Sequence, residues 1–158
     1  TEVSEQTIDD MPIKVYTAVN GGEKVGYAVE SMTKNGFGGV IRMMVGFAPN
    51  GQILNVNVLQ QAETPGLGTK MADEDNALLR SIKDKKAWEI EFKVKKDGGE
   101  LDALTAATIS SRAYYDAVER AYRAYRVAAG FGDSADGVSG ATATNAEGQQ
   151  AQEGGQNE

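Results

Sequence analysis

The stretch that most constrains this chain is 102–111, DALTAATISS, together with the run that follows it. The stretch holds small residues and short oxygen-bearing side chains, whereas residues 112–128 repeat apolar side chains at spacings of three and four. Such spacing places these side chains on one face of a helix. The sequence therefore predicts a tight loop leading into a long helix. The first turn of that helix offers unpaired N–H groups and partial positive charge, which suit a phosphate.

A plainer hypothesis fits the same residues. Ser110 or Ser111 can simply cap the helix, because a hydroxyl oxygen often accepts a hydrogen bond from an amide of the first turn. Under this hypothesis the stretch binds no ligand. Local chemistry favours the cap, so the choice depends on the rest of the chain.

A second motif lies upstream, where residues 61–68 read QAETPGLG. Pro65 fixes its own φ and favours an extended Thr64, and Gly66 suits the turn position that needs a positive φ. The motif therefore predicts a rigid corner with exposed amides that a flat ring can approach. Taken alone, it is better explained as an ordinary turn between a strand and a helix.

Together, ETPGLG and the later D-x-x-[ST]-[GA]-A-T-x-[ST] pattern resemble one family over residues 13–127. That family is the FMN-binding domain shared by the G subunit of the Rnf electron transport complex and the C subunit of the sodium-pumping NADH:quinone reductase. In the family, the threonine of the second motif carries FMN through a phosphoester bond, attached by a separate flavin transferase. The matching residue here is Thr108. Ala106 replaces the usual glycine, so its φ must be negative or strained.

The resemblance also implies a set of cofactor-binding residues. Thr108 bonds the phosphate, hydroxyl groups and first-turn amides help to hold it, and the ETPGLG corner borders the isoalloxazine ring. The implied residues are Asp102, Thr105, Ala107, Thr108, Ile109, Ser110, Ser111, Glu63, Thr64, Pro65, Gly66, Leu67 and Gly68. No catalytic side chain and no metal ligand are expected, because the cofactor supplies the chemistry.

The function implied is that of an electron-transfer subunit with covalent FMN in a membrane-bound, ion-translocating oxidoreductase. An Rnf-type ferredoxin:NAD oxidoreductase is favoured, and the C subunit of the quinone reductase is the alternative. Such a protein does not act alone. Its partners are the other subunits of the complex and the flavin transferase. It sits on the outer, periplasmic face of the cytoplasmic membrane, anchored by an N-terminal helix absent from this chain. Two other classes remain open: a non-redox secreted binding module and a soluble flavin reductase.

Composition narrows the function further. The 158 residues include no Cys and no His, which removes disulfides, thiolate nucleophiles and the commonest general base and metal ligand. A hydrolase must then rely on carboxylates, Lys or Tyr, whereas an electron carrier needs none of these. The net charge of −7 argues against a nucleic-acid partner.

The predicted fold is α+β, with a twisted, mainly antiparallel sheet of about five strands and helices on one face. The strands are expected at 13–19, 25–32, 40–47, 53–59 and 88–94, and a short helix at 69–81. Leu54, Val56 and Val58 are expected to face the core, as is Trp88. The glycine-rich residues 35–39, NGFGG, predict a hairpin loop rather than a phosphate loop. The tyrosines at 114, 115, 122 and 125 are expected to pack rather than to relay electrons.

The chain ends differ from its middle. Residues 1–12 are polar and predict a disordered segment, residues 13–129 form the domain, and residues 130–158 read as a low-complexity, disordered tail. The tail contains DGVSGATAT at 136–144, which keeps the glycine of the attachment pattern. Either Thr142 is a second flavin site, or the match is a coincidence of composition. We favour the coincidence, because no amphipathic helix follows.

Overall fold

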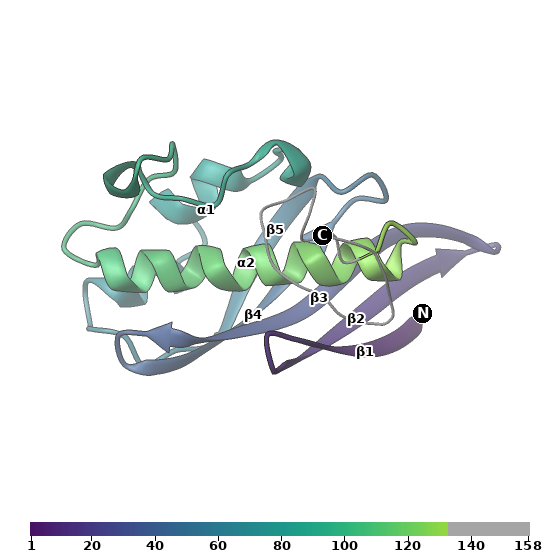
Figure 1. Cartoon of the computed structure of the whole chain (residues 1–158), viewed down its shortest axis with the longest axis horizontal. Helices are drawn as coiled ribbons and strands as arrows, with labels where there is room; N and C mark the ends of the chain where they lie inside the picture. Colours follow the sequence, from purple (N-terminus) through teal and green to yellow (C-terminus); the bar gives the residue numbers. More distant parts are fainter. Residues whose placement is uncertain (133–158) are drawn as a thin grey trace.

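Five consecutive strands form one antiparallel meander, and a long helix lies across one of its faces (Figure 1). The computed structural model describes residues 1–132. The sheet order β1-β2-β3-β4-β5 follows the sequence order. The strands are β1 (Glu2–Ile8), β2 (Met11–Asn20), β3 (Glu23–Gly36), β4 (Gly39–Phe47) and β5 (Ile53–Gln60), and the long helix is α2 (Thr108–Ala128). The predicted α+β class is confirmed.

The core lies between the sheet and α2. Alternate residues of β3, Tyr27, Val29, Ser31 and Thr33, are buried, as the period of two along a strand requires. The helix residues predicted to share one face are buried against them: Ala113, Tyr114, Ala117, Val118, Ala121 and Tyr125. The helix tyrosines pack as predicted, and the ring centroid of Tyr125 lies 5.0 Å from that of Tyr27.

Shorter helical turns connect β5 to α2: η1 (Gly68–Ala72), α1 (Ala77–Ile82), η2 (Ala87–Glu89) and η3 (Lys95–Asp97). The single helix predicted at 69–81 is therefore divided into η1 and α1. Asn76 causes the division, because its side-chain oxygen accepts from the amides of Leu78 and Leu79 at 3.0 and 3.1 Å. A side chain that bonds the first amides of a helix in this way starts a new helix.

The prediction of disorder for residues 1–12 is wrong for the part that forms β1. This strand pairs with β2 from Glu2 opposite Thr17 to Ile8 opposite Met11. The turn between the strands is anchored, because Asp9 forms ion pairs with Arg120 and Arg123 of α2. Polar composition did not reveal β1, since an edge strand exposes most of its side chains and is held by backbone hydrogen bonds.

The strand predicted at 88–94 is also wrong. Its residues form only η2 and a single bridge from Val94 to Leu101. Trp88, expected in the core, is 48% exposed, while Ile90 and Phe92 pack partly against the core. The alternating pattern correctly indicated that Ile90 and Phe92 are partly buried. A strand, however, also needs a neighbouring strand to complete its hydrogen bonds.

A register shift in β5 explains a smaller error. Phe47 pairs with Ile53, yet Gly46 pairs with Asn55, so Leu54 is an extra residue in a β-bulge. Leu54 is consequently 43% exposed rather than buried. After the bulge, Val56 is buried and Val58 is half-buried, as predicted.

The predicted tail begins where α2 ends. Residues 133–158, with the second attachment pattern and Thr142, lie outside the described residues. Within residues 1–132, none of the helices is both long enough and apolar enough to cross a membrane.

Candidate functional site

Three segments meet at the end of the molecule where α2 begins (Figure 1). They are the tip of the β3–β4 hairpin (residues 36–39), the ETPGLG corner (residues 63–68) and the first turn of α2. Glu63 joins them and is only 4% exposed. Its Oε1 accepts from the amide of Phe37 at 2.8 Å and from the hydroxyl of Ser110 at 2.5 Å. Its Oε2 accepts from the amide of Gly38 at 3.0 Å. One carboxylate therefore holds the hairpin tip and the helix together.

Two glycines allow this close approach. A Cβ on Gly38 would lie 1.8 Å from the carbonyl oxygen of Ala62, and a Cβ on Gly68 would lie 2.7 Å from Ser110 Oγ. Neither position can take a side chain without moving a neighbour. The 35–39 segment is thus the predicted hairpin loop, and the two sequence motifs are in direct contact.

The serines at the start of α2 do not cap it. Its N-cap residue is Ala107, and no side chain among the described residues accepts a capping hydrogen bond there. Ser110 donates to Glu63, and Ser111 Oγ accepts from the amide of Leu104 at 2.9 Å and donates to the carbonyl of Ala107 at 2.8 Å. The capping hypothesis is therefore wrong. A helix terminus without a side-chain cap presents amide dipoles to an anion.

Thr108 is the first residue of α2 and is half-buried. Before it, Thr105 and Ala106 are exposed, and after it Ile109 is 49% exposed. Ala106 has a φ of 59°, in the left-handed region that glycine occupies easily. Of the two possibilities that the sequence left open at this position, a negative φ or strain, the structure shows strain.

The corner has the predicted turn geometry. The amide of Leu67 donates to the carbonyl of Thr64 at 3.0 Å, and Gly66 has a φ of 78°. Thr64, Pro65 and Gly66 are exposed and Leu67 is half-buried. They form a surface next to the helix start. The side chain of Glu63 is instead buried, and it links the hairpin tip to α2 by hydrogen bonds. The sequence did not predict this structural role.

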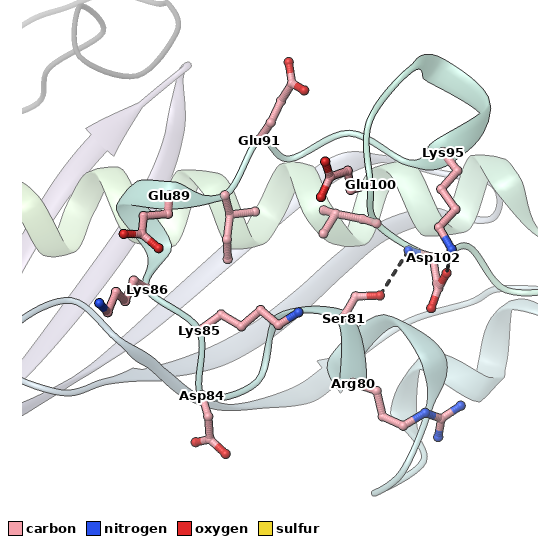
Figure 2. Close-up of a pocket in the computed structure, with 12 residues that line it drawn as sticks. Arg80, Ser81, Asp84, Lys85, Lys86, Glu89, Glu91, Lys95, Glu100 and Asp102 are labelled. Carbon is pink, nitrogen blue, oxygen red and sulfur yellow. Dashed lines mark hydrogen bonds and ion pairs between the residues drawn. The ribbon is translucent and has the colours of Figure 1, made fainter.

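Asp102 lies apart from these residues, on a pocket of about 640 Å³ between α1, η2 and η3 (Figure 2). Lys95 forms an ion pair with Asp102 at 2.8 Å, and its hydrogen bond holds the pKa of that carboxyl below the usual value. Among the predicted site residues, Asp102 alone lines this pocket, and the lining is charged apart from Ser81, Ile90 and Leu101. Such a surface suits a flat aromatic ring poorly, so this pocket does not match the predicted site for the isoalloxazine ring.

Phe37 lies beside Glu63, and the motifs did not reveal it. It stands at the hairpin tip with 66% of its surface exposed, although its amide is bonded to Glu63. A usable signal was present in the sequence, because a large aromatic residue between glycines is unusual in a loop that only reverses the chain.

Comparison with known proteins identifies the family. The family described as "FMN-binding domain" matches residues 36–123, which include all three segments. The chain is 42% identical over 115 residues to the G subunit of the ion-translocating oxidoreductase complex of Shewanella amazonensis, covering 70% of this chain and 53% of that protein. The G subunit of the Vibrio cholerae complex is 36% identical over 113 residues, with coverages of 70% and 54%. The chain thus spans about half the length of these curated relatives.

A solved structure shows the same fold. The crystal structure of Shewanella oneidensis NqrC matches with a TM-score of 0.54 and 22% identity, covering 75% of this chain and 63% of that chain. The resemblance inferred from ETPGLG and the 102–111 stretch is therefore confirmed by the family match over residues 36–123, and the solved structure confirms the fold. This chain belongs to the FMN-binding domain family.

Proposed function

We propose that this domain carries FMN as an electron carrier, attached through its phosphate to Thr108, in a membrane-bound ion-translocating oxidoreductase of the Rnf type. The observation that carries the proposal is the position of Thr108. It opens the 21-residue helix α2, whose N-terminus has no side-chain cap among the described residues. Ser110, two residues later, bonds the ETPGLG segment through Glu63.

The residues present fit FMN. The amides of the first turn of α2 and the exposed hydroxyl of Thr105 are donors for a phosphate. Beside them, Pro65 and Gly66 are exposed, and a Cβ built on Gly66 meets no described atom within 4 Å, so a flat ring has room to approach. When bound, the flavin supplies the redox chemistry. The chain's own residues hold the phosphate, orient the ring and keep the cofactor at one end of the domain.

Attachment requires a hydroxyl oxygen. Thr108 Oγ attacks the phosphorus of an activated flavin, a flavin dinucleotide, that the flavin transferase binds. The new Oγ–P ester bond replaces the bond from that phosphorus to the nucleotide, which departs as a nucleoside monophosphate and takes up the proton lost by the hydroxyl. Ser110 and Ser111 are poorly placed for this role, because they are 3% and 0% exposed and both hydroxyls are already hydrogen-bonded. The partial exposure of Thr108 supports it as the attachment site.

The relatives support the wider setting. The two curated relatives described above are named as the G subunit of an ion-translocating oxidoreductase complex, which favours this assignment over the C subunit of the quinone reductase. In that setting the domain belongs to a non-autonomous component of the complex. It sits on the outer face of the cytoplasmic membrane, with the other subunits as its electron donor and acceptor.

The test is the intact mass of the protein produced with and without a flavin transferase. With the enzyme, the parent chain is expected to gain the mass of one FMN less one water, and Thr108→Ala is expected to gain nothing. Thr142→Ala is the matched control and keeps the added mass. If Thr142→Ala loses the mass and Thr108→Ala keeps it, the attachment site is in the tail. If the parent never gains mass, the covalent-carrier proposal fails and the non-redox binding module becomes the better explanation.

A further inference from the structure

The β3–β4 hairpin tip presents a large aromatic side chain from a firmly held backbone. Phe37 is 66% exposed, yet its amide and that of Gly38 both donate to the buried carboxylate of Glu63, at 2.8 and 3.0 Å. Exposing a phenyl ring to water is unfavourable, and the two hydrogen bonds keep the hairpin tip from moving the ring into the core. The ring is therefore available to a ligand or partner at this end of the domain.

The same carboxylate fixes where the tip lies relative to α2. Oε1 of Glu63 accepts hydrogen bonds from both the Phe37 amide and the Ser110 hydroxyl, so these two donors lie next to each other. Ser110 and Thr108 belong to the same first turn of α2. The backbone of Phe37 is thus held close to the residue that we assign to flavin attachment.

We propose that Phe37 is the aromatic wall against which the isoalloxazine ring lies once FMN is attached at Thr108, and that Glu63 positions it. This inference rests on the proposed function. The ring system of a flavin is flat, aromatic and larger than the phosphate, so an ester to Thr108 leaves it to find an apolar surface nearby. Stacking on an aromatic side chain covers both partners from water and favours one orientation.

The other exposed aromatic side chains of the described residues cannot serve this purpose. Phe131 follows the far end of α2, and a helix of 21 residues spans about 30 Å. Trp88 lies beside Gly51 and Tyr125, and lines a separate pocket with Tyr122 and Arg126. Phe37 is therefore the exposed aromatic residue at the Thr108 end, and Phe131 is a natural control of similar exposure.

The experiment uses full-length protein carrying attached flavin and compares Phe37→Trp with Phe131→Trp. An indole in contact with a flavin donates an electron to the excited ring and quenches its fluorescence, and this effect needs contact or near contact. The emission per attached flavin is expected to fall several-fold in Phe37→Trp and to stay at the parent level in Phe131→Trp. In Phe37→Ala, the flavin is expected to become more accessible to quenching by iodide. The added mass and the far-ultraviolet circular dichroism are expected to match the parent in all three variants.

The outcomes separate the two proposals. If flavin is attached but Phe37→Trp and Phe131→Trp emit equally, and iodide reaches the flavin of Phe37→Ala no better than that of the parent, the ring does not lie on Phe37. The covalent-carrier proposal then stands unaffected. If the parent gains no flavin mass, both proposals fall together.

Discussion

Glu63 and Ser110 are 47 residues apart in the sequence, yet Ser110 Oγ donates to Glu63 Oε1 at 2.5 Å. Both side chains are buried, at 4% and 3% exposure. The contact joins the two motifs that first indicated the family, and the same oxygen also holds the amide of Phe37. A structural hydrogen bond therefore organises the site, while the exposed residues around it remain available to the cofactor.

Glu63→Gln is expected to destabilise the domain. A carboxylate accepts all three of its hydrogen bonds here, whereas an amide must turn one N–H group toward a donor. A buried donor left unpaired costs about 1–3 kcal/mol, which should appear as a lower free energy of unfolding in urea. The exposed Glu74→Gln is the matched control and should unfold like the parent. Equal stability of both variants would show that the carboxylate is replaceable.

Tyr114 and Tyr115 give a second matched pair. Both are buried, but the hydroxyl of Tyr114 has no hydrogen-bond partner among the described residues, whereas that of Tyr115 donates to the carbonyl of Asp102 at 2.7 Å. Tyr115→Phe should cost about 1 kcal/mol of unfolding free energy, and Tyr114→Phe should cost nothing or stabilise slightly. Equal losses in both variants would mean that a buried water satisfies Tyr114.

Periodicity alone predicted the elements whose burial depends on one face. The sequence predicted the apolar face of α2 and the alternation in β3, because the inward-facing residues of both elements pack on the same core. β1 and the 88–94 segment were not readable. An edge strand forms only where a neighbouring strand offers its backbone hydrogen-bonding groups. β2 offers them to β1, whereas no described strand offers them to residues 88–94. A local pattern carries no information about that neighbour.

The residues of the candidate site also fall into those that the sequence predicts and those that it does not. The resemblance predicts Thr108 and the corner as site residues, and the structure brings the first turn of α2 and the corner together through Ser110 and Glu63. The inward orientation of Glu63 depends on the hairpin tip, whose Gly38 lies 25 residues earlier in the chain. No pattern within the ETPGLG segment can indicate a partner at that distance. The hydrogen bond from the Phe37 amide to Glu63 was hidden for the same reason.

The contact between η3 and α2 is expected to depend on pH. Arg112 donates two hydrogen bonds to Asp97, at 2.7 and 2.6 Å, and these hold the pKa of Asp97 below its ordinary value of 3.8. A lowered pKa in the folded state gives stability that is complete above pH 3.8 and is lost as the pH falls through the folded value. Asp97→Asn should therefore lower the Tm at neutral pH, and the difference from the parent should vanish in strong acid.

A thermal melt series from neutral to acidic pH measures this dependence. Arg112→Gln should show the same convergence with the parent, and the double variant should lose little more than either single variant, because both remove one interaction. A Tm difference that stays constant down to strong acid would show that the pair contributes nothing through its charge.

The backbone of Ala106 is left-handed, and the cost of this conformation can be measured. A φ of 59° costs an alanine about 1–2 kcal/mol, and glycine avoids this cost while losing about 0.4–1 kcal/mol through the entropy of its unfolded state. Ala106→Gly should therefore raise the free energy of unfolding in urea by about 0.5–1 kcal/mol. The neighbouring Ala107→Gly is the control. Ala107 has a φ of −141° and is buried, so glycine there relieves no positive φ. It brings the entropic loss, removes a buried methyl group and should destabilise. If both variants lose stability equally, the loop relaxes around Ala106 in solution and the residue stores no strain.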